Sequence, residues 1–236
     1  NILLATTTVA AIVEEPVKIV CDGKPIMVDA VGVVLAETIF HPQGGGQPAD
    51  KGEINNIVVL SVRENKERLT EQGLPTIYHY FDKSKVDIDQ LIVGQTVSMN
   101  VDAEFRQQCR RSHSAGHLIA DVLERDSLFS AYQAKSTQGH HFPGGEYIKA
   151  LVNIAPANTE IFCKQLIAGS KRLISTDSPI ATDEVNHMRH IKIGDSARMC
   201  GGTHVNSTKE LEGCVVTKIK AKQQNEQTEL TIFYQG

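Results

Sequence analysis

The chain is poor in the residues that build aromatic surfaces, since it has no tryptophan and only 5% aromatic residues among its 236. Proteins that bind single strands without sequence preference stack bases on aromatic side chains, so this composition argues against that class. Long apolar runs are also missing. Residues 1–13 are apolar, but a membrane-spanning helix needs about 20 such residues, and no basic leader accompanies them. We expect a strand there and a soluble protein with no membrane partner.

Cysteines are sparse and widely separated. The five are Cys21, Cys109, Cys163, Cys200 and Cys214. Their odd number and wide spacing argue against the disulfide framework of a small secreted domain. We therefore expect a reducing compartment, a cytoplasmic location and no disulfide-linked partner.

An excess of positive charge is absent too, because the formal net charge is −4. This value excludes a globally basic nucleic-acid binder, although one local basic face can still supply phosphate contacts. Two groups of residues are candidates for such a face, and the alternative is that both are ordinary solvated surfaces. They are Arg106, Arg110, Arg111 and Arg125, and then Arg189, Lys192 and Arg198.

The pattern of short apolar runs predicts an α+β protein in two parts. Up to about residue 101, turn signals separate six predicted strands, at 17–20, 26–28, 32–39, 54–62, 77–81 and 95–101, which favours a small β-barrel or a folded sheet. Asp102 is expected to cap a helix that ends near Arg125, and Asn158 a second one that ends near Leu173. Strands are predicted at 147–154, 180–186, 213–221 and 228–234. We therefore predict a β-barrel domain at 1–101 and, at 102–236, two main helices packed on an antiparallel sheet.

Two short patterns carry the predicted chemistry. In His113-Ser-Ala-Gly-His117 the two histidines are four residues apart, so on a helix both imidazoles face the same side. In Cys200-Gly-Gly-Thr-His204 the two glycines allow a tight loop that can turn a thiolate and an imidazole toward one point. Each pair by itself is commonly incidental, but together they supply three nitrogens and one sulfur, a set suited to tetrahedral Zn²⁺.

Several other chemistries are not indicated. Ser114 stands where the helical zinc-protease motif has its glutamate base, so a catalytic zinc would need a base elsewhere or would activate its own water. The glycines at 44–46 are not followed by the Lys-Ser/Thr of a phosphate loop. We find no dinucleotide fingerprint and no serine nucleophile elbow.

At these motifs the sequence resembles the editing domains of alanyl-tRNA synthetases and the AlaX proteins. The two metal motifs match in order, and Phe40-His-Pro-Gln-Gly-Gly-Gly-Gln-Pro48 is similar to the glycine-rich signature of that family. The resemblance runs from about Val33 to the C-terminus and fits the medium-length AlaX type, a β-barrel followed by an editing core. It implies Zn²⁺-dependent hydrolysis of the ester that joins serine, or glycine, to mischarged alanine tRNA. An alanine pocket discriminates serine by only about 10²-fold, so a second hydrolytic site is needed.

The resemblance also implies roles for individual residues. The metal ligands are His113, His117, Cys200 and His204, and whether all four bind at once stays open because catalysis needs an open or fifth position. Thr38 is the expected contact for the substrate side chain, although it fits an ordinary strand residue equally well. Gln138 and His141 are expected beside the substrate, or alternatively in a solvent-facing turn. Gly44, Gly45, Gly46 and Gln47 are expected to contact the tRNA end through backbone N–H groups, or to form a plain hairpin loop.

The sequence departs from the family pattern at Ala36, where a carboxylate is common, and at Met199, where proline is common. Two competing functions stay open. One is a zinc hydrolase of small esters or amides, and the other is a metal-stabilised tRNA-binding module without activity. Chelation separates them, because an enzyme loses activity while it stays largely folded, whereas removal of a structural zinc unfolds the domain.

Overall fold

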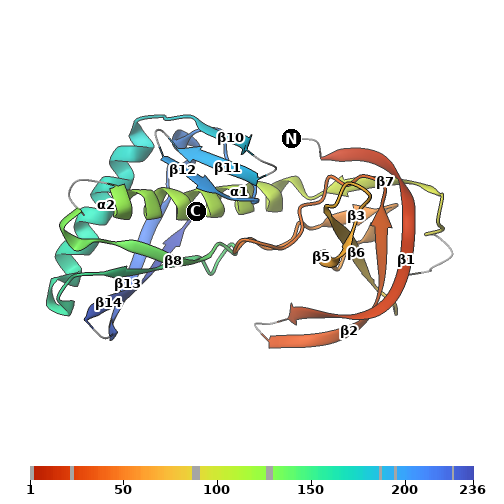
Figure 1. Ribbon diagram of the computed structural model, residues 1–236, viewed down its shortest axis with the longest axis horizontal. Coiled ribbons are helices and arrows are strands. Elements are labelled where there is room, and N and C mark those ends of the chain that lie inside the picture. Colours follow the sequence, from red (N-terminus) through yellow and green to blue (C-terminus); the bar gives the residue numbers. More distant parts are fainter. Residues whose placement is uncertain are drawn as a thin grey trace. The chain divides into compact units, whose positions relative to one another are not determined.

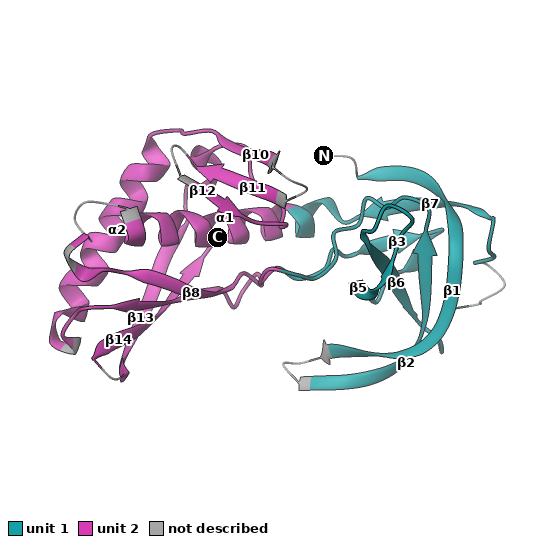
Figure 2. Cartoon of the chain, viewed as in Figure 1, with its two compact units in different colours: residues 1–44, 48–106 teal, residues 45–47, 107–236 magenta. Residues whose placement is uncertain are grey.

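The protein has an α+β fold that consists mostly of antiparallel strands, as the computed structural model in Figure 1 shows. The structure describes residues 3–21, 24–86, 91–125, 130–185, 188–193, 196–224 and 226–236. The chain forms two compact units, residues 1–44 with 48–106 and residues 45–47 with 107–236 (Figure 2). The predicted α+β class is confirmed, and the predicted domains at 1–101 and 102–236 stay a prediction.

Unit 1 is built on one antiparallel sheet. In order across the sheet its strands are β4 (Ile57–Val58), β3 (Gly52–Ile54), β7 (Thr96–Val101), β1 (Leu4–Cys21), β2 (Lys24–Leu35), β6 (Pro75–Asp82) and β5 (Ser61–Leu69). Among the described residues no pairing joins the outer strands β4 and β5, so the predicted barrel is not confirmed. Exposed and buried residues alternate along β7, so every second side chain faces the core on one side of the sheet.

Two local expectations for unit 1 can be compared with the structure. The strand expected at 32–39 ends at Leu35, so Thr38 lies in the loop that follows β2 and is not a strand residue. Asp102 caps the helix α1 (Ala103–Arg125), since its carboxylate accepts the Phe105 N–H at 2.9 Å. The predicted helix start is therefore confirmed. Asp102 can form this cap because its short side chain reaches the first turn, where the N–H groups have no helical partner.

Unit 2 combines two helices with two antiparallel sheets. The four-stranded sheet has the order β13 (Val215–Gln224), β14 (Gln227–Gln235), β9 (Tyr147–Val152) and β8 (Lys135–His140), and the three-stranded sheet has β10 (Ile180–Val185), β11 (Met188–Ile193) and β12 (Ser196–Met199). The second helix is α2 (Thr159–Ser175), and single 3₁₀ turns lie at Ser130–Tyr132, Pro156–Asn158 and Thr208–Leu211. Asn158 makes no side-chain cap, so that expectation is wrong.

The core of unit 2 gathers around α1. Figure 1 shows α1 between the two sheets, and one buried cluster joins Leu118 and Ile119 of α1 to strands of both. Every described residue from Ser112 to Leu123 except His117 is buried. A helix covered on nearly all sides is central to its domain, and here it carries the first predicted metal motif.

No helix in the part of the chain that the structure describes is long and apolar enough to cross a membrane. Cys109, Cys163, Cys200 and Cys214 are free thiols, and the Cys21 side chain lies outside the described residues. The cytoplasmic location stays a prediction.

Candidate functional site

The first two candidate ligands project from one side of α1. One helical turn separates His113 from His117, and their rings stack with centroids 4.9 Å apart and planes 17° from parallel. The helix therefore places both imidazole rings on one side, as the spacing predicts, because residues four apart lie above one another on a helix. His113 is buried, while His117 is partly exposed.

The other two candidates come from the loop that follows β12. Cys200 Sγ lies 3.4 Å from His113 Nε2, 3.3 Å from His117 Nε2 and 3.3 Å from His204 Nε2. The four ligand atoms of His113, His117, Cys200 and His204 lie within 4.8 Å of one another, so this cluster could hold a metal ion. The structure thus brings together all four residues that the sequence predicted.

The donor set fits a metal. One thiol proton can be donated to only one of the three ring nitrogens around Cys200, whereas a cation among these atoms would accept a lone pair from each. Burial raises the pKa of the Cys200 thiol, and the Gly202 N–H and the Arg189 charge act in the opposite direction. Burial, with a smaller effect of Arg198, lowers the pKa of His117 to about 4, so its ring is neutral at neutral pH. Neutral imidazoles with one thiolate are the ligands that Zn²⁺ prefers.

Contacts behind the rings hold their orientation. Ser114 Oγ lies 3.2 Å from His204 Nδ1 and accepts the Val205 N–H at 3.1 Å. Arg110 Nε donates to the His204 carbonyl oxygen at 2.6 Å. Ser114, which stands where a protease would have its base, therefore supports a ligand on the neighbouring loop. Gln47 supports His113 in a comparable way, with its side-chain oxygen 2.7 Å from Nδ1.

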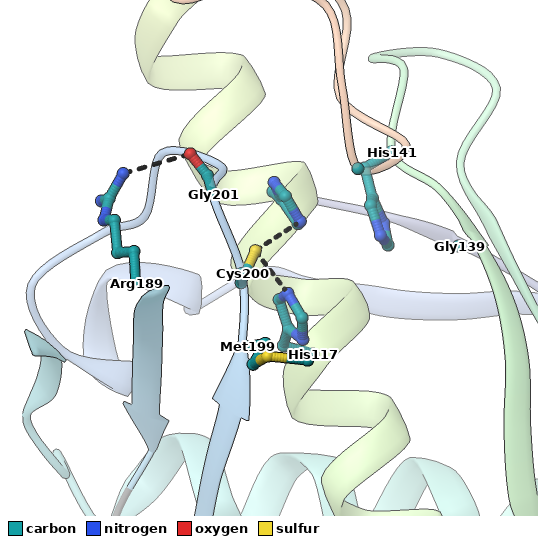
Figure 3. Close-up of a pocket in the computed structure, with 9 residues that line it drawn as sticks. His117, Gly139, His141, Arg189, Met199, Cys200 and Gly201 are labelled. Atoms are coloured by element: carbon teal, nitrogen blue, oxygen red, sulfur yellow. Dashed lines mark hydrogen bonds between the residues drawn. The ribbon is translucent and has the colours of Figure 1, made fainter. Parts of the chain in front are cut away.

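The cluster opens onto a pocket of about 490 Å³. It is lined by Gly45, His113, His117, Gly139, His141, Arg189, Met199, Cys200 and Gly201. Figure 3 shows Cys200 facing His117, with Arg189 and Gly201 on one side and His141 on the other. The Arg189 side chain donates to the Gly201 carbonyl oxygen at 3.1 Å. A pocket bordered by candidate metal ligands and two other polar side chains, His141 and Arg189, has the features of a reaction site.

His141 is held against this pocket by a buried tyrosine. Its Nδ1 lies 2.5 Å from Tyr234 Oη, which donates to the Ser112 carbonyl oxygen at 2.9 Å. Because the tyrosine proton is used there, Nδ1 of His141 carries a proton that it donates to Oη, and Nε2 is left as an acceptor. Burial, with smaller effects of His117 and His140, lowers the pKa of His141 to about 3, so the ring is neutral. The sequence analysis named His141, whose role beside the substrate stays a prediction, but it missed Tyr234, which lies 93 residues away.

The remaining predicted residues occupy different environments. Gln138 is exposed on β8 and does not line the pocket described above. Gly45 lines the pocket, whereas Gly44 belongs to unit 1. Gly45 and Gly46 form a turn with positive φ angles of 57° and 81°, which favour glycine. The tRNA-end contacts expected from residues 44–47 and the substrate role of Gln138 stay predictions.

Thr38 also belongs to unit 1 and has well-defined partners there. His79 is fully buried, and its Nδ1 lies 3.1 Å from the Val33 carbonyl oxygen, so Nδ1 carries the ring proton. Thr38 Oγ1 must then donate to His79 Nε2, at 2.7 Å, and it accepts the Phe40 N–H at 3.1 Å. Because its proton is donated to His79, the Thr38 hydroxyl can only accept a hydrogen bond from any further group.

For Arg106 and Arg110, neither the candidate basic face on α1 nor its alternative, an ordinary solvated surface, is what the structure shows. Arg106 and Arg110 are only 7% and 9% exposed, and Arg111 donates to the carbonyl oxygens of Glu210 and Glu212. Arg106 pairs with the buried Asp50, with Nε 2.7 Å from Oδ1. The Arg125 side chain lies outside the described residues. Arg106, Arg110 and Arg111 therefore bind other groups of the fold. Arg189, which belongs to the second candidate basic face, is exposed beside the pocket.

Comparisons with known proteins show what the chain is similar to. The family model described as the threonyl and alanyl tRNA synthetase second additional domain matches residues 188–227. The alanyl-tRNA editing protein AlaX-M of Pyrococcus horikoshii is 27% identical over 190 residues, which cover 80% of this chain and 81% of that protein. AlaX-L of the same organism is 29% identical over 84% of this chain. The alanine–tRNA ligase of Sphingopyxis alaskensis is 28% identical over 81% of this chain.

The share of each relative that is matched differs widely. The chain spans half of AlaX-L and 24% of the ligase. The matched part of the ligase is thus a fraction of a much longer enzyme. Only an activity that belongs to the matched part of these longer proteins is relevant to this chain.

Proposed function

We propose that this chain, a member of the AlaX family of alanyl-tRNA editing proteins, is an aminoacyl-tRNA deacylase that releases serine or glycine from mischarged alanine tRNA. The observation that carries this proposal is the convergence of His113, His117, Cys200 and His204, three of which border one pocket. The similarity to AlaX-M over four-fifths of both chains supports the reaction.

Zinc is the metal that we propose for the cluster, because three imidazoles and one cysteine suit Zn²⁺ better than Mg²⁺ or Ca²⁺. When bound, the ion would supply Lewis acidity that favours attack of water on an ester carbonyl. His141 Nε2, an acceptor beside the ligands, would orient the attacking water or a ribose hydroxyl. Arg189, exposed at the same pocket, would contact a phosphate of the tRNA end.

Selectivity for serine would come from the Thr38 hydroxyl. Since that hydroxyl can only accept from a further group, it would accept the hydrogen bond of the serine side chain and leave alanine without this contact. A site that depends on such a bond can reject the analogue that lacks it. Thr38→Val is therefore expected to reduce serine release and to leave Zn²⁺ binding unchanged, as measured by deacylation and by metal content. Equal serine release by the variant would remove Thr38 from the substrate site.

The decisive experiment measures deacylation of alanine tRNA charged with serine, glycine or alanine, with and without a chelator. We expect rapid, chelator-sensitive release of serine while alanine stays attached. Cys200→Ala should abolish this release, and Cys163→Ala, a partly exposed cysteine of α2, is the matched control. If serine stays attached although zinc occupancy is full and the protein is folded, the proposal fails.

One observation favours a second candidate, a zinc-stabilised tRNA-binding module without activity. Four ligand-capable groups converge, and four filled positions are typical of structural zinc. This candidate predicts that chelation unfolds unit 2 and that tRNA binding survives when deacylation is absent. Circular dichroism after chelation separates the two candidates, because the enzyme should stay folded.

A further inference from the structure

The side chain of Gln47 is fully buried, with 0% of its surface exposed. It reaches the interior of unit 2 from the glycine-rich loop, which packs closely at this point. A Cβ on Gly46 would lie 2.5 Å from the Gly139 carbonyl oxygen, and the Gly46 carbonyl oxygen accepts the His141 N–H at 2.8 Å. The glycine before Gln47 therefore lets the loop approach β8 closely enough to insert the glutamine.

The three hydrogen bonds of Gln47 define which atom is the oxygen. Oε1 accepts the Thr203 N–H at 2.9 Å, and Nε2 lies 2.9 Å from Thr203 Oγ1. A flipped amide would place its NH₂ group against the Thr203 N–H, so the assignment of oxygen and nitrogen is consistent. The same Oε1 lies 2.7 Å from His113 Nδ1. Because Oε1 can only accept, the proton of the His113 ring is on Nδ1.

This tautomer has a direct consequence for the cluster. With its proton on Nδ1, His113 presents the lone pair of Nε2, the atom that lies 3.4 Å from Cys200 Sγ. The other two bonds of Gln47 go to Thr203, which lies between Cys200 and His204 in the chain. Gln47 therefore joins the helix that carries one ligand pair to the loop that carries the other.

We propose that Gln47 is the positioning residue of the metal site: it fixes the Nδ1–H tautomer of His113 and ties the Cys200–His204 loop to α1. Hydrogen-bond partners behind a metal-ligating histidine orient the ring, and their loss commonly reduces metal affinity by about 10–100-fold. The proposal rests on the proposed function only through the metal site. Its tests use metal and protein without tRNA, so a failure of deacylation does not affect it.

Two substitutions separate positioning from packing. Gln47→Met has a similar volume but no acceptor, and we expect it to weaken Zn²⁺ binding about 10–100-fold. Gln47→Glu keeps an acceptor for His113 Nδ1 and for the Thr203 N–H, and the Thr203 hydroxyl can turn to donate. We expect its Zn²⁺ affinity to stay within about threefold of the unchanged protein. Gln43→Met, at an exposed glutamine of the same loop, is the matched control and should have no effect.

Zn²⁺ affinity is measured by competition with a chromophoric chelator, and folding of each metal-free variant by circular dichroism. A Gln47→Met variant that binds as tightly as the unchanged protein would overturn the proposal, and so would an equal loss in Gln47→Glu. A role in packing predicts the reverse order, since methionine fits an apolar site and a carboxylate does not. If Gln47→Met fails to fold, Gln47→Glu decides by itself, and a loss of tenfold or more refutes the proposal.

A spectroscopic test needs no metal. Long-range ¹H–¹⁵N NMR correlations distinguish the two tautomers of a neutral histidine. We expect His113 to be protonated on Nδ1 in the metal-free protein and in Gln47→Glu, and to show a mixture of tautomers in Gln47→Met. Protonation on Nε2 in the unchanged protein would contradict the proposal.

Discussion

Two adjacent glycines in the Cys200–His204 loop should respond very differently to the same small change. Neither Gly201 nor Gly202 has a φ angle in the left-handed region, so alanine meets no backbone strain at either position. A Cβ on Gly201 would meet nothing within 4 Å. A Cβ on Gly202 would lie 2.1 Å from His113 Cε1, 2.2 Å from His113 Nδ1 and 2.9 Å from Gln47 Oε1.

The size of the effect follows from these distances. To reach an ordinary contact distance of about 3.4 Å, the new methyl group and the His113 ring must separate by about 1.3 Å. Metal-to-ligand distances tolerate only about 0.2 Å, so His113 and Cys200 cannot both keep their places. We expect Gly202→Ala to lower Zn²⁺ affinity by about 10–100-fold, which corresponds to about 1.4–2.7 kcal/mol.

The assay compares Gly202→Ala with Gly201→Ala in a competitive Zn²⁺ titration, and thermal unfolding in chelator shows whether each metal-free protein is folded. Gly201→Ala should bind as the unchanged protein does. If a folded Gly202→Ala variant binds within about twofold of Gly201→Ala, the loop does not approach His113 as closely as the structure indicates, and the reasoning is wrong.

Three further predictions follow from other contacts. Tyr234→Phe removes the hydroxyl between His141 and the Ser112 carbonyl, so kcat for serine release should fall roughly tenfold while metal content stays constant; an unchanged kcat would contradict the orienting role of Tyr234. Asp50→Asn leaves the buried Arg106 without its charged partner, which should cost about 3–5 kcal/mol in urea unfolding, and a loss below about 1 kcal/mol would refute a buried ion pair. Burial lowers the pKa of His79 in the folded protein from 6.5 to about 4, so below pH 6.5 the unfolded chain binds a proton more readily than the folded chain does. The contribution of the neutral ring to the free energy of unfolding is therefore complete above pH 6.5, and about 3 kcal/mol of it is lost as the pH falls to 4. When the unchanged protein and His79→Gln are both unfolded in chelator, the variant should lack this loss. Parallel profiles of unfolding free energy against pH for the two proteins would refute the role of His79.

The metal cluster was predictable because its geometry is local. Helical spacing places His113 and His117 on one side of α1 whatever surrounds the helix. The glycines between Cys200 and His204 allow a loop tight enough to bring both side chains to one point, and all four side chains do converge. The helix start at Asp102 was predictable for the same reason, since its hydrogen bond spans three residues.

Other predictions failed where the outcome depends on distant segments. Charge at Arg106 and Arg110 indicated an exposed face, but both side chains find partners in segments 56 and 94 residues away and are buried. Asn158 has the right residue type for a cap, yet its backbone does not adopt the geometry and the side chain does not bond. The strand expected at 32–39 ended at Leu35, which places Thr38 in a loop with His79 as its partner.

The α+β class, the central helix and the four candidate ligands could be predicted from local patterns, because periodicity and short spacing act within a few residues. How those ligands are held depends on contacts between distant segments. Gln47 lies 66 residues from His113 and 156 from Thr203, and Tyr234 lies 93 residues from His141. No local pattern encodes such contacts, because they exist only after the loop, the helix and the sheet have packed around one buried core.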